Sequence, residues 1–197
     1  MEFRPEELIK GGRFKDLFSS SGQKVQQLVL DELNGLLKDS KYKEEANYGH
    51  LCNLYPALAF CRVYEKLGKT RQESIEAVKS AMYDFLAPER RKMEELAAEG
   101  RFIQYIKSSM PPRFGNPPAY GWDVEFEDKG DREYVMTVRK CIYCSIFKQY
   151  GIEELTPVFC GVDDLLFKDL PNGGLYYTQQ MGCGGKECDY VFRQTGE

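Results

Sequence analysis

The chain has 197 residues, of which 42% are hydrophobic and 29% are charged, and its formal net charge is −4. This length suits one domain, or one domain with a helical extension, and the composition is that of an ordinary globular protein. Because the charge balance is acidic and the sequence has no long basic block, we expect neither nucleic acid nor a membrane surface as a partner.

The first residues, MEFRPEELIKGGRF, carry charges where a secretion signal would need an apolar run. No stretch approaches the roughly 18 apolar residues of a membrane-spanning helix. We therefore expect a cytoplasmic protein. In that compartment thiols stay reduced, so the seven cysteines, an odd number, do not indicate a disulfide framework.

The first half of the chain has the periodicity of helices. Residues 23–38 place apolar side chains on one stripe, and residues 47–67 form a second candidate that should kink or begin anew at Pro56 and end at Gly68. Thr70 and Glu73 match a capping box at the start of another helix. Pro88 should begin a further charged helix.

The pattern changes after residue 108. Residues 109–121 are rich in proline and glycine and predict a connecting loop. Beyond them, WDVEFE and REYVMTVRK predict one strand pair and LYYTQQM and ECDYVFR another, the latter joined by the glycine-rich GCGGK. Short helices are expected between the pairs, at CIYCSIFKQYG and at IEELTPVFCGVDDLLF, the second interrupted near Pro157.

These elements predict an α+β protein, in which an N-terminal helical half packs on a C-terminal antiparallel sheet of about four strands with short inserted helices. The expected regions are 1–108 (helical), 109–121 (loop) and 122–197 (α+β, carrying the site), packed as one integrated domain.

Five cysteines fall in the second half, and they are the candidates for chemistry: Cys141, Cys144, Cys160, Cys183 and Cys188. The C-x-x-C spacing of Cys141 and Cys144 occurs in zinc sites, but a second such pair is missing and the one histidine, His50, is remote in sequence. A metal site is therefore one hypothesis, and packed core thiols are another.

A reactive thiol site is the third hypothesis. Cys141 and Cys144 lie where a strand ends and a helix begins, which lowers the pKa of a thiol. Cys160 precedes Asp163 by three residues, so a helix would place the carboxylate one turn from the thiol. Such a pair can supply a nucleophile and a proton acceptor or donor.

The same residues carry a resemblance to a known family. In order, the chain has Lys140-Cys141, YGIEEL at 150–155, FCGVD at 159–163, a Gly-Gly turn ending at Gly185, and Cys188-Asp-Tyr. Over about residues 122–192 this series resembles the L-2-amino-thiazoline-4-carboxylic acid hydrolases, whereas the helical half fits only in general style. The C-x-x-D step also looks like the cysteine–aspartate pair of organomercurial lyases.

The resemblance implies an enzyme that opens a small sulfur and nitrogen heterocycle to an N-carbamoyl-cysteine. It implies that Cys160, Asp163, Cys141 and Cys188 are catalytic. As a mechanistic hypothesis, we assign Cys160 as the nucleophile or as the residue that positions it, Asp163 as the acid and base, Cys141 as the second thiol and Cys188 as a residue that lines the opposite wall. No cofactor is required on this hypothesis. The alternative is a divalent or soft metal ion held by Cys141, Cys160 and Cys188.

A carboxylate substrate needs a cation, and Arg139 and Arg113 are the candidates, with Asp189 and Gly185 as further substrate-binding residues. The expected partner is a small molecule, and a homo-oligomer is compatible with the sequence. A non-catalytic module that binds a thiol, a soft metal or a small sulfur compound remains the competing function. The roles of His50, Cys144 and Cys183 are open.

Overall fold

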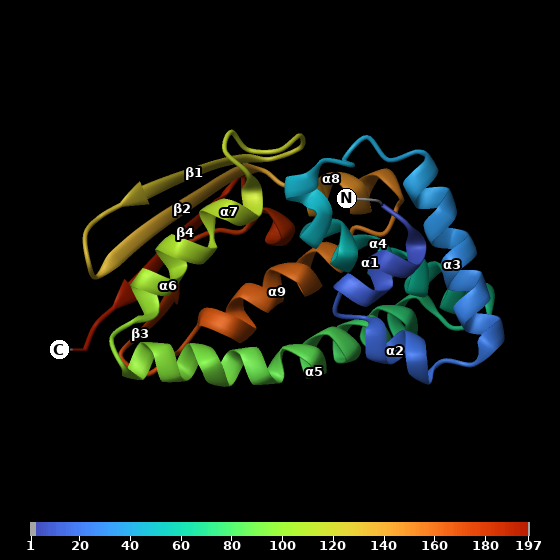
Figure 1. The fold of residues 1–197 in the computed structure, drawn as a ribbon, viewed down its shortest axis with the longest axis horizontal. Coiled ribbons are helices and arrows are strands. Elements are labelled where there is room, and N and C mark those ends of the chain that lie inside the picture. The colour runs from blue at the N-terminus through green and yellow to red at the C-terminus, as the bar shows by residue number, and fades with distance from the viewer. Residues whose placement is uncertain (1–2, 197) are drawn as a thin grey trace. The chain divides into compact units, whose positions relative to one another are not determined.

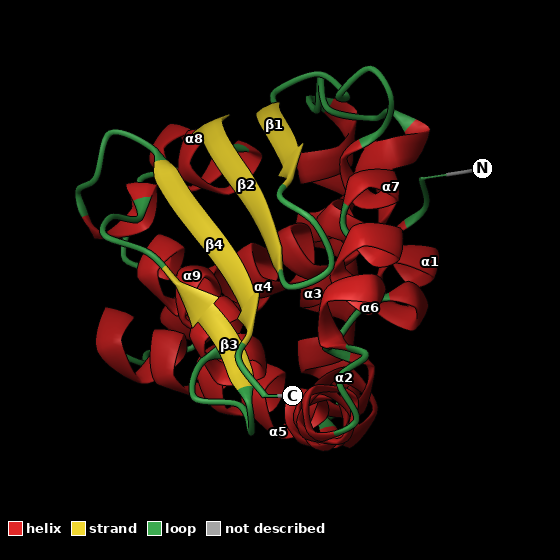
Figure 2. Ribbon diagram, turned by 90° about the vertical axis from the view of Figure 1, so that its left-hand side faces the viewer, coloured by secondary structure: helices red, strands yellow, loops and turns green. Residues whose placement is uncertain are grey.

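The structure is a computed structural model that describes residues 3–196. The chain divides into two compact units, Met1–Phe85 and Leu86–Glu197, and the division falls within the long helix α5 (Arg71–Ala98). The predicted helical region 1–108 therefore extends past the first unit. Helices fill the described part of the first unit, and the second combines helices with an antiparallel sheet (Figures 1 and 2). The fold class is α+β, as predicted.

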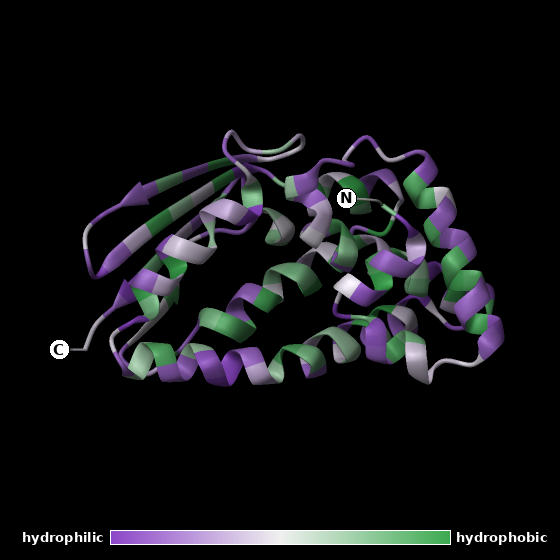
Figure 3. Cartoon of the chain, viewed as in Figure 1, coloured by the Kyte–Doolittle hydropathy of each residue, from purple (hydrophilic) through white to green (hydrophobic). Residues whose placement is uncertain are grey.

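The first unit contains helices connected by short loops. They are α1 (Pro5–Gly11), α2 (Lys15–Ser20), α3 (Gln23–Lys38), the 3-10 turn η1 (Glu45–Asn47), α4 (Tyr48–Lys66) and the first part of α5. Helix α3 has the predicted bounds, and hydrophobic and hydrophilic residues lie side by side along it (Figure 3). Its apolar stripe is buried at Val29, Leu33, Leu36 and Leu37, so the periodicity correctly identified the face toward the core.

Helix α4 runs without a break through Pro56, so the prediction of a new helix there is wrong. A proline inside a helix frees the carbonyl of the residue four positions earlier, here Cys52. The backbone at Gly12 lies directly against that Cys52 carbonyl, and a Cβ at Gly12 would collide with it. The backbone of Arg13 also donates to the Asn53 side chain, at 3.0 Å. Another segment therefore packs closely on the interrupted turn.

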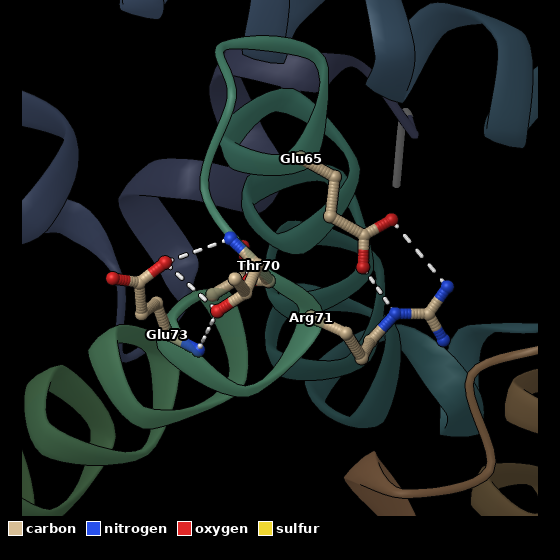
Figure 4. A network of polar contacts seen from close by, with 5 residues as sticks. Glu65, Thr70, Arg71 and Glu73 are labelled. Atoms are coloured by element: carbon tan, nitrogen blue, oxygen red, sulfur yellow. Dashed lines mark hydrogen bonds and ion pairs between the residues drawn. The ribbon is translucent and has the colours of Figure 1, made fainter.

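The predicted end of α4 and start of α5 are confirmed. Gly68 adopts φ +93°, which suits glycine, and α4 ends two residues before it. At the start of α5 the Glu73 carboxylate accepts from the Thr70 backbone at 2.8 Å, and the Glu73 backbone donates to the Thr70 hydroxyl at 3.2 Å (Figure 4). This reciprocal pair is the capping box.

Pro88 does not begin a helix, because α5 continues through it to Ala98. The carbonyl that this proline frees belongs to Asp84, an exposed residue, so water can satisfy it. The helix instead ends before Gly100, which adopts φ +73°. Phe102 and Ile106, which continue the apolar spacing after Pro88, belong to a separate helix, α6 (Phe102–Ser109).

The second unit contains the sheet and its helices. After α6 come α7 (Pro111–Phe114), β1 (Asp123–Asp128), β2 (Glu133–Lys140), α8 (Ile142–Gln149), α9 (Leu155–Phe167), β3 (Gly173–Tyr176), the 3-10 turn η2 (Met181–Cys183) and β4 (Cys188–Gln194). The strand order is β1-β2-β4-β3, antiparallel throughout, so the two predicted strand pairs are confirmed with the helices inserted between them (Figure 2).

Helices α6 and α9 cover one face of this sheet. Phe192 on β4 has its ring 6.2 Å from Phe102 of α6 and 5.6 Å from Phe167 of α9. Side chains alternate between faces along a strand, so Tyr190 and Cys188 lie on the same helix-covered face as Phe192. Arg90 of α5 donates to the carbonyls of Leu165, Lys168 and Asp169 and so caps the end of α9.

Three local predictions in this unit need correction. The loop 109–121 contains the short helix α7. Helix α9 is not interrupted at Pro157, because this proline is in the first turn, where a backbone N–H has no partner within the helix. The strand expected at LYYTQQM stops at Tyr176, since the backbone N–H groups of Thr178 and Gln179 bind the side chain of Asp189 instead of a neighbouring strand.

Among the described residues, no helix combines the length and the apolar character needed to cross a membrane.

Candidate functional site

Helix α9 presents Cys160 and Asp163 one turn apart, as the sequence predicted. Both residues are partly buried, and Phe159, Val162 and Leu166 anchor the buried side of the helix. The spacing of three residues therefore places the thiol and the carboxylate on neighbouring positions of one helix surface.

Strand β4 supplies the residues opposite α9. Tyr190 donates its hydroxyl to Oδ2 of Asp163 at 3.0 Å, and it accepts from the side-chain amide of Gln180 at 3.2 Å. Cys188 lies two residues earlier on the same face of β4 and is buried. The chain Gln180–Tyr190–Asp163 thus fixes the position of the carboxylate next to two cysteines.

The turn η2 reaches both thiols with consecutive backbone groups. The N–H of Met181 donates to Sγ of Cys188 at 3.3 Å, and the backbone N–H of Gly182 lies near enough to Cys160 to lower the pKa of that thiol against the larger effect of burial. A Cβ at Gly182 would lie 2.5 Å from Sγ of Cys160 and 2.8 Å from Cγ2 of Thr156. Glycine is required here because the backbone of η2 lies directly against the side chains of Cys160 and Thr156 on α9.

Burial keeps both of these thiols protonated at neutral pH. It raises the pKa of Cys160 far above the ordinary thiol value, and the nearby Asp163 and Cys188 raise it further. Burial also raises the pKa of Cys188, against the effect of the N–H of Met181. Burial and the adjacent Asp163 raise the pKa of Tyr190 as well, so its hydroxyl remains a donor. A thiolate at Cys160 therefore requires a base.

Cys141 and Cys144 lie at the start of α8. Cys141 is the N-cap residue, and both thiols are partly exposed. The proximity of the two thiols lowers the pKa of Cys144 and, together with burial, raises that of Cys141. The charge on Cys144 also acts on Cys160 and Cys188. Cys144 thus lies in the same neighbourhood as Cys141, Cys160 and Cys188. The sequence analysis had grouped only the latter three.

Asp189 and Arg139 lie on the opposite face of the sheet from Cys188. Asp189 accepts from the backbone of Thr178 and of Gln179, both at 2.9 Å, and holds the loop before β4. Burial opposes its ionisation, but these hydrogen bonds lower its pKa overall. Arg139 forms ion pairs with Glu125 at 2.9 Å and with Glu187 at 3.5 Å. Both residues therefore have structural partners away from the thiols.

Gly185 and Arg113 have different surroundings. A Cβ at Gly185 would lie 2.9 Å from the carbonyl of Gln180, so this glycine allows the loop to close. Arg113 is exposed on α7, next to Phe114. A series of ring contacts runs from that helix toward Cys160: Phe114 to Trp122 at 4.7 Å, Trp122 to Tyr143 at 5.9 Å, and Tyr143 to Phe159 at 5.0 Å.

The metal hypothesis receives no geometric support. Within residues 3–196, no three His, Cys, Asp or Glu side chains are grouped so that they could hold a metal ion. His50 lies on α4 in the first compact unit and is partly buried, whereas the cysteines above all belong to the second unit.

Two contributors to the site were missed from the sequence, Tyr190 and Gln180. Tyr190 follows Cys188 by two residues on a strand, so alternation alone would have put both side chains on one face. Its partner Asp163 is 27 positions away along the chain, and a hydrogen bond over that separation has no local sequence signal.

A neighbouring pair resembles the first. Tyr177 donates to both carboxylate oxygens of Asp164, at 2.7 and 2.8 Å. Two adjacent carboxylates on α9 are therefore each held by a separate tyrosine, and only Asp163 is paired with Tyr190, next to Cys188 on β4.

A comparison with sequence models of protein families identifies the family of the chain. A sequence model of the family L-2-amino-thiazoline-4-carboxylic acid hydrolase matches residues 52–192. The chain belongs to this family. The match begins 70 positions before residue 122, inside α4, so family membership covers much more of the helical region than the motifs alone indicated. It also covers every residue of the Cys160, Asp163, Cys188 and Tyr190 cluster.

Other comparisons add little. No curated protein is significantly similar to the chain. One solved structure, the H-NOX domain SO2144 of Shewanella oneidensis in its Fe(II)CO ligation state, has 12% sequence identity and a TM-score of 0.34. It covers 96% of this chain and 98% of its own, and a likeness this weak supports no conclusion about fold or function.

Proposed function

We propose that the chain is a hydrolase that opens a small cyclic amidine with sulfur in the ring, of the 2-amino-thiazoline-carboxylate type, at the cluster of Cys160, Asp163, Cys188 and Tyr190. The observation that carries the proposal is the hydrogen bond from Tyr190 to Asp163, one helical turn from Cys160. Membership of a family named for such a hydrolase supports the substrate class.

In the proposed reaction, Asp163 takes the proton of Cys160 while Sγ attacks the ring carbon between nitrogen and sulfur. The C–S bond of the ring then breaks, and the departing sulfur receives that proton. Water adds to the same carbon, the bond to Cys160 breaks, and the product is an N-carbamoyl-cysteine with a free thiol. Because the resting thiol is neutral, Asp163 acts as the base at the moment of attack.

Tyr190 would keep the carboxylate in place during these proton transfers. The hydrogen bond fixes one oxygen of Asp163, Oδ2, and so holds the carboxylate one helical turn from the thiol. The backbone N–H groups of Met181 and Gly182 would hold Cys188 and Cys160 in position. Arg113 and Arg139 are the proposed partners for the substrate carboxylate, and Arg139 would have to exchange its ion pairs with Glu125 and Glu187 for the substrate.

The test is turnover of L-2-amino-thiazoline-4-carboxylate by the reduced full-length chain, followed by the appearance of a new thiol and by mass spectrometry of the product. We expect turnover by the native chain, activity close to background for Cys160→Ser, and a loss of about 10²- to 10⁴-fold for Asp163→Asn. Asp164→Asn removes the adjacent carboxylate and Cys61→Ala removes a buried thiol of the first unit. Both should stay active.

The outcomes separate enzyme from binding module. Full turnover by Cys160→Ser would overturn the role of the thiol. Saturable binding of the thiazoline without product would replace the enzyme with a module that binds a small sulfur compound. Metal analysis of the same sample tests the alternative of a soft ion held by Cys141, Cys160 and Cys188, since near-stoichiometric zinc with protected thiols would favour it.

A further inference from the structure

Cys141 and Cys144 form a pair of thiols that the proposed hydrolysis does not need as a pair. Cys141 is the N-cap of α8 and Cys144 is the third residue of that helix. Side chains at these two positions face each other, as the N-cap and N3 side chains do in a capping box. The two thiols are close enough that each one shifts the pKa of the other.

The backbone at this position suits a disulfide. In a regular α-helix, Cα atoms three residues apart are separated by about 5 Å, from the rise and radius of the helix. Disulfides join Cα atoms roughly 4.4–6.8 Å apart. The carbonyl of Cys141 accepts from the Ser145 backbone at 3.1 Å, so the first turn of α8 is closed around the pair. Bond formation would then need side-chain rotation and no new backbone path.

The two thiols also differ in chemistry. The proximity of Cys141 lowers the pKa of Cys144, so Cys144 is the thiol that ionises first. Cys141 keeps its proton, and its pKa is raised by the proximity of Cys144 and by burial. Both residues are partly exposed, whereas Cys188 is buried. Of the two thiols, Cys144 is therefore the one that ionises and reacts more readily with a reagent from solution, with a second thiol beside it.

We propose that Cys141 and Cys144 are a redox-active dithiol that a small disulfide such as oxidised glutathione converts to an intramolecular disulfide. The thiolate of Cys144 attacks one sulfur of the reagent, which forms a mixed disulfide and releases one glutathione thiolate. Sγ of Cys141 then attacks Sγ of Cys144, and the second glutathione leaves. The proton of Cys141 passes to a released thiolate, so two protein thiols and one disulfide give one protein disulfide and two reagent thiols.

The experiment equilibrates the full-length chain with glutathione buffers of increasing oxidised fraction, quenches it with acid, and blocks free thiols with N-ethylmaleimide. Trypsin cleaves after Lys140 and after Lys148, so the peptide 141–148 contains both cysteines and no other. We expect this peptide to change from two maleimide groups to none, with a mass lower by two hydrogen atoms than the unmodified dithiol peptide.

Variants identify the attacking thiol. In Cys141→Ser the mixed disulfide cannot be resolved, so we expect glutathione to stay attached to Cys144. In Cys144→Ser we expect much slower modification of Cys141. Cys183→Ser is the matched control, because Cys183 is an exposed cysteine outside the pair, and its peptide 141–148 should oxidise as in the native chain.

Three results would overturn the proposal. The peptide 141–148 could keep two maleimide groups even in fully oxidised glutathione, while Cys183 becomes modified. The disulfide could map to Cys160 and Cys188 instead. Glutathione could attach to Cys141 and not to Cys144 in the single variants, which would reverse the assigned roles. None of these readouts depends on turnover of a thiazoline, so the proposal stands or falls separately from the hydrolase function.

Discussion

The hydroxyl of Tyr190, on β4, donates a hydrogen bond to the carboxylate of Asp163 on α9. Replacing it in Tyr190→Phe removes the donor and keeps the ring packed against Tyr177, which lies 5.7 Å away. A hydrogen bond to a charged group contributes about 1.5–3 kcal/mol, so we expect kcat to fall roughly 10- to 100-fold. The measurement is kcat and KM on the thiazoline substrate.

The neighbouring tyrosine provides the control for this prediction. Tyr177→Phe removes an equivalent hydroxyl that binds Asp164. We expect near-native kcat for Tyr177→Phe and an unchanged KM for Tyr190→Phe, because the hydroxyl positions the base and does not bind substrate. Equal losses in the two variants would mean that the effect is structural.

At the scale of elements, the contact between η2 and α9 depends on one glycine. In Gly182→Ala the new Cβ would collide with Sγ of Cys160, so η2 must move away and the N–H groups at 181 and 182 lose the two thiols. We expect activity to fall at least 10-fold while the far-UV circular dichroism spectrum stays native. Rate and spectrum are measured on the same sample.

Gly49→Ala serves as the comparison. Gly49 is in α4, and a Cβ there would meet no atom within 4 Å. Alanine in an exposed helical position is expected to stabilise by roughly 0.5–1 kcal/mol relative to glycine and to leave turnover unchanged. Native activity in Gly182→Ala would show that the N–H groups of η2 do not matter to the site.

The capping box at the start of α5 allows a prediction about stability at an element far from the site in the sequence. Thr70→Ala removes the hydroxyl that accepts from the Glu73 backbone at the start of α5. We expect the free energy of unfolding to fall by about 1 kcal/mol in urea denaturation. Ser80→Ala lies in the exposed middle of the same helix, where alanine is the better helix former, and should be neutral or slightly stabilising. A neutral Thr70→Ala would contradict the cap.

For the whole molecule, buried thiols predict a loss of stability at alkaline pH. Burial raises the pKa of Cys52 to about 11 and that of Cys61 to about 12, from an ordinary value of 9.0. Below pH 9 both the folded and the unfolded chain keep the protons of Cys52 and Cys61. These two thiols therefore add no pH dependence to the free energy of unfolding in that range. Above pH 9 the unfolded chain loses protons that the native chain retains, so the free energy of unfolding falls by up to about 1.4 kcal/mol per pH unit for each thiol.

The slope of this fall can be measured by urea denaturation between pH 7 and pH 11. Cys61→Ala should lower stability below pH 9 because it leaves a cavity, and above pH 9 its stability should fall less steeply than that of the native chain. Cys183→Ser, which replaces an exposed cysteine outside the core, is the control. Parallel slopes for Cys61→Ala and the native chain would contradict the expected linkage.

The sequence by itself determined the local features. The stripe of α3, the capping box, the two strand pairs and the placement of Cys160 and Asp163 on one turn of α9 all follow from spacings of a few residues. They could be predicted because helix and strand periodicity are properties of neighbouring residues. The family resemblance rested on the same short motifs.

Tertiary structure decided the rest. Helix α4 continues through Pro56, and Gly12, 44 positions earlier, packs against the carbonyl that this proline frees. The hydrogen bond of Tyr190 to Asp163 joins a strand to a helix, and the pairing of the strands sends Asp189 to the other face of the sheet. Such contacts join residues far apart in the chain, and no periodicity within one segment encodes which residue will lie opposite.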